Sequence, residues 1–263
     1  MRYALKFGCN GRGFSGYARQ PELRTVEGEI IRALQKSKII SNLDGCRFQS
    51  ASRTDKGVSA RGNVVALNTD FRKDEILGAL NAHLEDIWFY GLAEVDEEFN
   101  PRHARKRWYR YFLVDEEIDI EKIEEAATLF KGEHDFSNFA RVEDKDPRRN
   151  IEKIEISKEG DLLVFDFRAQ SYLWHMIRRI VKALTNYAKR EITLEDIRNA
   201  LDTQEKKDLG IAPPEPLILM DVEYDFDIPG DKMQIKKVKD SIQGLLLEMK
   251  IQNTILGQML DIK

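Results

Sequence analysis

Apolar and polar positions recur with two periods along the chain, and together they predict a mixed α and β protein. Alternation with period 2 is typical of half-buried strands and predicts strands at residues 2–9, 63–71, 86–95, 107–114, 151–157, 162–169 and 217–224. Apolar spacing of three and four predicts helices at residues 26–39, 73–83, 120–130, 172–188 and 193–201. Thr193 and Asp196 fit a capping box, which supports the start of the last helix. Strands interrupted by helices in this way are typical of an α+β sheet covered on one side.

The tail from residue 231 onward has a different pattern. Its apolar residues occupy the a and d positions of a heptad repeat, interrupted by Gln252: Ile235, Val238, Ile242, Leu245, Met249, Leu256 and Met259. A helix that packs onto its own domain is the favoured interpretation, ahead of a helix that binds a partner. With the turn-prone Asn100-Pro101 as a second boundary, we expect three parts, at residues 1–100, 101–228 and 229–263.

The composition narrows the class of protein. Hydrophobic residues make up 42% of the chain and charged residues 33%, which is typical of a soluble globular protein. The opening residues lack the apolar core of a signal peptide, and no apolar run reaches membrane-spanning length. Cys9 and Cys46 form no CxxC pair, and the four histidines show no metal-ligand spacing. We therefore expect a cytoplasmic protein with no membrane partner, metal or cofactor.

The net charge of −4 argues against a nucleic-acid partner, but the basic residues are segregated from the acidic ones. Residues 1–21, 101–112 and 167–190 contain four, five and six Arg or Lys residues and no acid. Between Asp44 and Asp70 the single acid is Asp55. Any one basic run is more often a solvated face, but together they favour a groove that binds a polyanion.

Asp55 lies in the segment SRTDKGV (52–58). Gly57 permits the backbone geometry of a tight turn, and the flanking Arg53 and Lys56 favour the ionised carboxylate. An ionised carboxylate in a defined position can act as a nucleophile or as a base. Taken alone, however, such a turn is more often structural.

Several segments together resemble one family. The string ASRTDKGVSARGNVVAL (51–67) closely resembles the signature of the tRNA pseudouridine synthase A family. Further segments resemble that family in the same order along the chain: FNPRHARKRWYRYFL (99–113), GEHDFSNF (132–139), YLWHMIRRIVKAL (172–184) and IAPPEPLILMDVEYD (211–225). The sequence departs from the family pattern at Ser59, where the family has histidine, and at Tyr17, where it has tryptophan.

The resemblance implies a fold and a set of site residues. It implies the pseudouridine synthase fold, in which two α/β halves share a mainly antiparallel sheet, with helices on one side and a central catalytic cleft. Asp55 matches the catalytic aspartate of the family, and Arg178 matches an arginine that pairs with it. Tyr109 matches the tyrosine that stacks on the target base, and Arg53 matches the arginine associated with displacing that base.

The implied activity is isomerisation of uridine to pseudouridine in the anticodon arm of tRNA, at positions 38–40. In this chemistry Asp55 attacks a flipped-out uridine, and no cofactor or metal is needed. The family also implies a homodimer that grips one tRNA. One alternative is a non-catalytic tRNA-binding protein on the same fold. A metal-dependent nuclease is a third, but it lacks a carboxylate cluster near the acid-free segments.

Several of these residues also have ordinary structural interpretations. Tyr109 and Tyr111 lie on one predicted strand, and we expect one to face a core and the other a groove. Arg178 lies opposite the apolar face of its helix, where a solvated arginine is usual, and His175 is better explained as a structural histidine. The glycines at 11, 13 and 16 resemble a phosphate-binding loop, but no Lys-Ser/Thr pair follows them.

Overall fold

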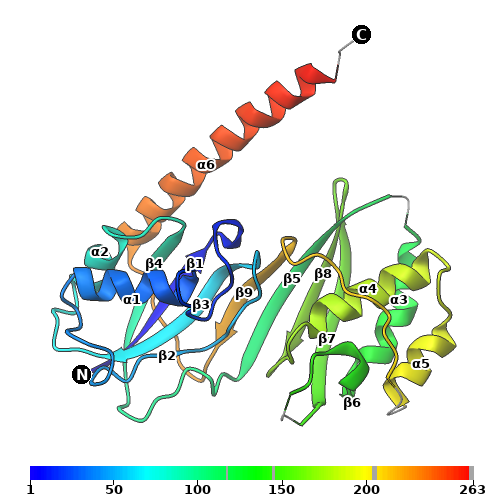
Figure 1. Ribbon diagram of the computed structural model, residues 1–263, viewed down its shortest axis with the longest axis horizontal. Coiled ribbons are helices and arrows are strands. Elements are labelled where there is room, and N and C mark those ends of the chain that lie inside the picture. Colours follow the sequence, from blue (N-terminus) through cyan, green and yellow to red (C-terminus); the bar gives the residue numbers. More distant parts are fainter. Residues whose placement is uncertain (117, 144–145, 203–205, 261–263) are drawn as a thin grey trace.

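The computed structural model (Figure 1) describes residues 1–263 except 117, 144–145, 203–205 and 261–263. The strands are β1 (Arg2–Cys9), β2 (Gln49–Ser50), β3 (Ser59–Asn68), β4 (Ile87–Val95), β5 (Lys106–Val114), β6 (Gly132–Asp135), β7 (Arg148–Glu159), β8 (Leu162–Ala169) and β9 (Leu217–Glu223). The α-helices are α1 (Val26–Lys36), α2 (Ile76–Asn81), α3 (Ile120–Ala127), α4 (Met176–Ala188), α5 (Leu194–Asp202) and α6 (Lys232–Met259).

The described strands form a nine-stranded sheet in the order β4-β1-β3-β9-β5-β8-β7-β6, with β2 paired to β3. All pairs are antiparallel except β3 with β9, which run parallel through Ser59↔Ile218 and Ala60↔Leu219. β9 thus comes late in the chain but lies in the middle of the sheet, between β3 and β5. Through this strand the loop that follows Asp55 meets the segment that precedes β9.

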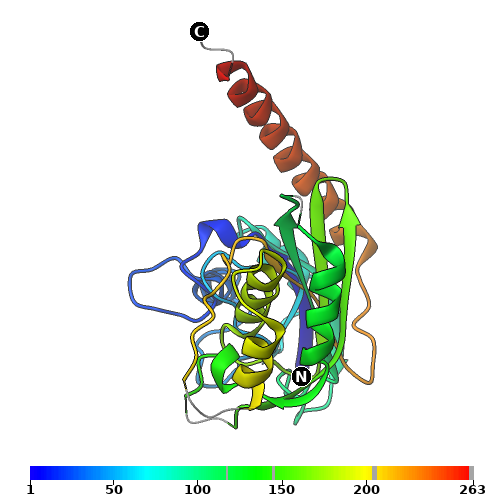
Figure 2. The ribbon, with the colours of Figure 1, turned by 90° about the vertical axis from the view of Figure 1, so that its right-hand side faces the viewer.

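Helices cover one face of the sheet. Figure 2 shows α3, α4 and α5 gathered on one side of β7 and β8, with α1 on the same side. Their buried residues recur at helical spacing, for example Ile30 and Leu34 in α1 and Ile180 and Leu184 in α4. These apolar faces pack on the sheet and remove large apolar side chains from water, which is the main stabilising contribution to such a fold. The expected α+β class with helices on one side is therefore present.

The predicted strands and helices all occur, with shifted ends. The helix expected from residue 172 begins at Met176, because His175 adopts a left-handed conformation with φ of 68° that cannot continue a helix. The capping box is confirmed, since Thr193 N donates to Asp196 at 2.8 Å and Asp196 N donates to Thr193 Oγ1 at 3.2 Å. β2 and β6 were not predicted, because two and four residues are too short for a periodic pattern.

The expectation that Tyr109 and Tyr111 face opposite ways is wrong. Residues two apart on a strand point to the same face. Both tyrosines are buried on the helix side, whereas Trp108 and Arg110 point to the opposite face, where they contact Asp166. The same alternation places Arg107 on the buried side with the tyrosines.

The preferred interpretation of the tail, a helix packed on its own domain, holds for its start alone. Gln234 of α6 is buried and accepts a hydrogen bond from Asn81 at 3.0 Å, and Trp88 donates to Ser241 at 3.3 Å. The C-terminal part of the helix projects away from the body (Figures 1 and 2), and its large apolar side chains after Ser241 are exposed, except for the half-buried Leu245. The nine residues of β4 span about 30 Å and the 28 residues of α6 about 42 Å, so this edge strand cannot cover the whole helix. Among the described residues, no helix combines the length and apolarity that crossing a membrane requires.

Candidate active site

Asp55 lies in the loop that joins β2 to β3, and the loop is shaped by a turn. Val58 N donates to Asp55 O at 3.2 Å, which closes the turn. Gly57 has φ of +85°, a conformation that side chains other than glycine rarely adopt. A Cβ atom at Gly57 would also lie 3.3 Å from Glu215 Oε1. The glycine therefore allows the turn to approach the segment before β9.

The glycine-rich loop at residues 10–17 supports the Asp55 loop from the other side. Gly11 N donates to Ser59 Oγ at 3.0 Å, and Tyr17 N donates to Thr54 O at 3.1 Å. A Cβ atom at Gly11 would lie 2.3 Å from Val58 O, so only glycine permits this close approach. Ser59 and Tyr17, two of the departures from the family pattern, both take part in this contact. The loop thus supports the segment that carries Asp55.

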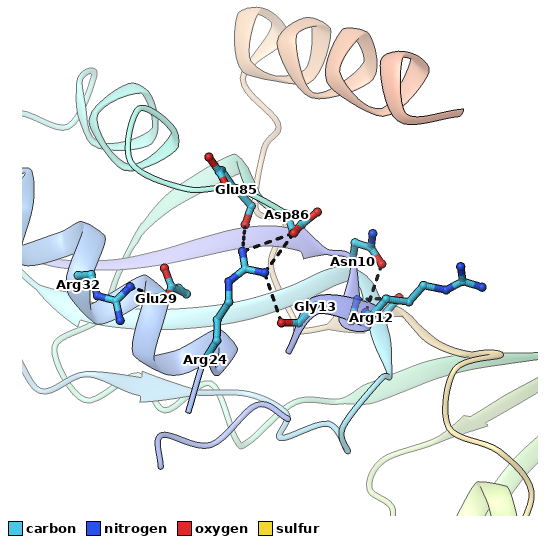
Figure 3. Close-up of polar contacts among 10 residues, drawn as sticks. Asn10, Arg12, Gly13, Arg24, Glu29, Arg32, Glu85 and Asp86 are labelled. Carbon is cyan, nitrogen blue, oxygen red and sulfur yellow. Dashed lines mark hydrogen bonds and ion pairs between the residues drawn. The ribbon is translucent and has the colours of Figure 1, made fainter. Parts of the chain in front are cut away.

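Arg24 fixes the same glycine-rich loop to the rest of the N-terminal sheet (Figure 3). Its Nη1 donates to Gly13 O at 3.3 Å, and its Nη2 donates to Glu85 O at 3.1 Å. The guanidinium also forms an ion pair with Asp86 at 3.3 Å and lies 4.4 Å from the centre of the Phe14 ring. One side chain therefore ties the loop to the turn before β4, which limits its movement relative to Asp55.

Each oxygen atom of the Asp55 carboxylate accepts a hydrogen bond, one from a residue of α4 and the other from a residue just before α4. Arg178 Nη1 donates to Asp55 Oδ2 at 2.7 Å, although the two residues are 123 positions apart in sequence. Trp174 Nε1 donates to Asp55 Oδ1 at 2.7 Å. The side chains of Asp55 and Arg178 are 16% and 12% exposed, so water screens the pair weakly. The structure thus brings together two of the predicted site residues.

Arg178 is held in place by backbone atoms of the segment before β9. Its Nε donates to Ala212 O at 2.8 Å, and its own carbonyl accepts from Ala212 N at 3.1 Å. The planar guanidinium can therefore bind a carbonyl with one edge and Asp55 with the other. The solvated position expected from the helix pattern is not observed, because the segment before β9 covers this face of α4.

His175, which the sequence analysis interpreted as a structural histidine, lies beside Asp55. Its Nε2 is 3.7 Å from Asp55 Oδ2, and it occupies the position before the first residue of α4. Burial lowers the pKa of the imidazole, and the positive charge of Arg178 acts in the same direction against the opposing effect of Asp55. His175 is therefore mainly neutral at neutral pH, so Arg178 supplies the cation beside Asp55.

Tyr109 lies on β5 within the electrostatic reach of Asp55. Its ring is 8% exposed and contacts Tyr172 edge-on, with ring centres 5.3 Å apart. Burial raises the pKa of the Tyr109 phenol to about 12, against the effect of Arg107, and the charge of Asp55 adds to the increase. The hydroxyl is therefore protonated at neutral pH and is available as a hydrogen-bond donor.

Arg107 is a further residue of the site that the sequence analysis did not single out. This buried arginine donates to Ser52 Oγ at 3.0 Å, to Ala51 O at 3.0 Å, and to the carbonyls of Arg102 and Gln170. It thereby connects the strand of Tyr109 to the loop of Asp55. The sequence could have indicated Arg107 by one signal: it lies two residues before Tyr109 and therefore on the same face of the strand.

Arg53 is placed differently from the other predicted residues. It is exposed, and it makes no hydrogen bond or ion pair with any residue that the structure describes. Its guanidinium is consequently free to contact a ligand. The site therefore consists of a fixed carboxylate, a paired arginine, a neutral histidine and a protonated tyrosine, with a free arginine on the same loop as the carboxylate.

Comparison with known proteins identifies the family. A family described as "tRNA pseudouridine synthase" matches residues 126–225. The tRNA pseudouridine synthase A of Thermococcus sibiricus is 46% identical over 246 residues, which cover 91% of each chain. The enzyme of the same name from Pyrococcus abyssi is 43% identical over 247 residues and covers 92% of each chain. The solved Cbf5-Nop10-Gar1 complex aligns with a TM-score of 0.32 at 16% identity, over 68% of this chain and 54% of that one, and adds nothing to the assignment. Because relatives above 40% identity match over nine tenths of its length, this chain belongs to the tRNA pseudouridine synthase A family.

Proposed function

We propose that this protein is an isomerase that converts uridine to pseudouridine in tRNA, with Asp55 as the nucleophile. The observation that carries the proposal is the 2.7 Å pair of Asp55 and Arg178, in a family whose members are named for this reaction. A carboxylate fixed in this way is pre-organised to form a bond with a nucleotide. Membership of the family and the intact pair both weigh against the alternative of a non-catalytic tRNA-binding protein.

In the proposed reaction, a carboxylate oxygen of Asp55 attacks the uridine at C1′ of the ribose or at C6 of the base. The bond between C1′ and N1 breaks, the uracil turns, and a new bond forms between C1′ and C5. The hydrogen at C5 then leaves as a proton. N1 takes up a proton, and the bond between Asp55 and the nucleotide breaks, which regenerates the carboxylate. A C–N and a C–H bond are thus exchanged for a C–C and an N–H bond, so the rearrangement needs no redox partner or group donor.

A uridine within a stem must leave its stack before Asp55 can reach it. We assign Arg53, which is exposed and unpaired among the described residues, to the space that the base vacates. We assign Tyr109 to stacking on the displaced base, a contact worth roughly 1–3 kcal/mol. Because its ring is 8% exposed, a base that stacks on it must displace a neighbouring side chain such as Tyr172. We propose positions 38–40 of the tRNA anticodon arm as the targets. We also propose that the protein acts in the cytoplasm.

Release of tritium from tRNA labelled at C5 of uridine tests the function directly. Pseudouridine formation releases the label and leaves the RNA at full length. A binding protein retains the label, and a nuclease shortens the RNA. Intact RNA that keeps its tritium after incubation with the wild-type protein contradicts the proposed activity.

Replacing Tyr109 with Phe should preserve stacking but remove a protonated hydroxyl that lies within the electrostatic reach of Asp55. We expect turnover to fall by about tenfold, the equivalent of one lost hydrogen bond, with RNA affinity nearly unchanged. Tyr111→Phe is the matched control, because that hydroxyl lies on the same face of β5 and donates to Pro213 O at 3.1 Å. Single-turnover tritium release on both variants makes the comparison. Wild-type turnover in Tyr109→Phe shows that the hydroxyl has no role.

We propose that the chain is divided into three parts, at residues 1–100, 101–228 and 229–263. We also propose that the protein forms a homodimer through the third part. Beyond Ser241 helix α6 exposes its heptad stripe to water, with Met249, Leu256 and Met259 each more than half exposed. A second copy of α6 in antiparallel orientation fits this stripe. The antiparallel orientation places the sheet-containing parts of the two subunits at opposite ends of the helix pair. It also keeps the lysines of the two copies, at positions 232, 236, 237 and 239, apart from one another, which avoids repulsion between like charges.

Charges placed on this stripe should weaken the dimer. We expect Met249→Glu combined with Leu256→Glu to raise the dimer dissociation constant at least tenfold, because each carboxylate would have to be buried between helices. Lys250→Glu, on the outer side of the same helix, is the control and should leave association unchanged. Analytical ultracentrifugation measures both. Equal association of the two variants would show that α6 takes no part in the dimer.

A further inference from the structure

Trp174 contacts Asp55 directly, although the sequence analysis assigned it no role. The indole Nε1 donates to Asp55 Oδ1 at 2.7 Å. The backbone of Trp174 is fixed as well, because Arg141 N donates to its carbonyl at 2.8 Å in an isolated β-bridge. The residue therefore reaches the opposite carboxylate oxygen from the one that Arg178 binds.

The indole ring is held by polar neighbours and not by the core. The guanidinium of Arg141 lies 4.2 Å from the ring centre, a cation–π contact, and the imidazole of His175 lies 4.8 Å from it. At the same time the side chain is 44% exposed. A large aromatic residue that leaves nearly half of its surface in water contributes less to stability than a core residue does. Its fixed orientation instead points its donor at Asp55.

A single donor leaves a carboxylate free to turn. The terminal torsion of an aspartate has broad minima, so the Arg178 bond to Oδ2 does not by itself determine the plane of the group. A second donor on Oδ1 does determine it. Because an indole is neutral, it does so without adding a second full positive charge next to the carboxylate. Each oxygen also keeps a further lone pair for attack on the nucleotide.

We propose that Trp174, held by Arg141, is a positioning residue that sets the orientation of the Asp55 carboxylate before the nucleotide binds. This inference rests on the proposed function of Asp55 as nucleophile. Its role differs from that of Arg178, which supplies the charge. Loss of Trp174 should therefore lower the rate of the chemical step and leave RNA affinity intact.

Trp174→Phe tests the proposal, because phenylalanine keeps an aromatic ring for Arg141 and lacks the N–H group. We expect single-turnover tritium release to slow by about tenfold, with the RNA dissociation constant within twofold of wild type. Trp108→Phe is the matched control. Trp108 also donates its indole N–H to a carboxylate, that of Asp166, but on the opposite face of the sheet. We expect this control to turn over at the wild-type rate.

A second measurement reports on the contact without any turnover. In a ¹H–¹⁵N spectrum, the indole resonance that disappears in Trp174→Phe should shift when Asp55 is replaced with Ala, while the two other indole resonances stay in place. An unshifted resonance, a wild-type rate for Trp174→Phe, or a loss confined to RNA affinity would each overturn the proposal. If wild-type protein itself releases no tritium, the proposed function fails, and the indole resonance alone then decides whether Trp174 holds Asp55.

Discussion

Asp55→Asn is expected to abolish pseudouridine formation while tRNA binding survives. The amide has nearly the shape of the carboxylate, but it is a poor nucleophile and carries no charge. We expect tritium release to fall by at least about four orders of magnitude, the scale typical of a lost covalent nucleophile. Release of tritium from labelled tRNA measures the rate, and fluorescence anisotropy with unlabelled enzyme and labelled tRNA measures binding.

Asp55→Ala serves as a second variant, because the amide oxygen of Asn could still accept a hydrogen bond from Arg178 or from Trp174. Both variants remove the charge partner of Arg178 and should unfold below the wild-type temperature, so turnover is compared at a temperature at which each is folded. If both retain substantial turnover, another group is the nucleophile and the central assignment is wrong. A loss of binding that parallels the loss of turnover would favour the tRNA-binding alternative for Asp55.

Arg178→Met is expected to cause the second largest loss, a decrease in turnover of about a thousandfold. The substitution leaves the Asp55 carboxylate, which is 16% exposed, without its cation and leaves Ala212 O without its donor. Removing one pre-organised electrostatic partner of a reacting group typically costs about 10²–10³ in kcat, or roughly 3–4 kcal/mol of activation free energy. Single-turnover kinetics should show the decrease in the rate constant of the chemical step.

The comparison with neighbouring variants separates a specific role from a general effect on α4. Arg178→Lys keeps the charge but cannot bind Ala212 and Asp55 with one planar group, so we expect an intermediate rate. Arg179→Met is the control on the same helix, because Arg179 pairs with the exposed Asp208 at 2.9 Å. Equal losses in Arg178→Met and Arg179→Met would indicate that damage to the helix, and not the pair with Asp55, lowers the rate.

The pattern of the chain predicted each long strand and helix, because these elements have enough residues to display a period. It missed β2 and β6, which are too short, and it set the start of α4 four residues early. The left-handed conformation of His175 ends the helical pattern there, and no period in the sequence reveals a single backbone torsion. The projection of α6 was also missed, because an apolar stripe shows that a face needs cover but not which surface provides it.

The site residues also fall into two groups, those that the sequence indicated and those that only the structure revealed. Asp55, Tyr109, Arg178 and Arg53 were named from short motifs that resemble one family, and their roles stay predictions until the variants are measured. Arg107, Trp174 and His175 were identified by their contacts. Arg107 and Trp174 lie within segments that resemble the family, 99–113 and 172–184. No local pattern reveals that one is buried against four acceptors or that the other donates to Asp55.

The sequence by itself determined the local geometry: which segments become strands and helices, where Gly57 permits a turn, and which residue types are present for chemistry. These features depend on neighbours within a few residues. The tertiary structure alone decided which of those residues meet. Insertion of β9 between β3 and β5 brings the segment containing Ala212 to α4 and aligns Arg178 with Asp55 across 123 residues of chain. Strand order in a sheet depends on packing and hydrogen bonding over the whole fold, so no local pattern contains it.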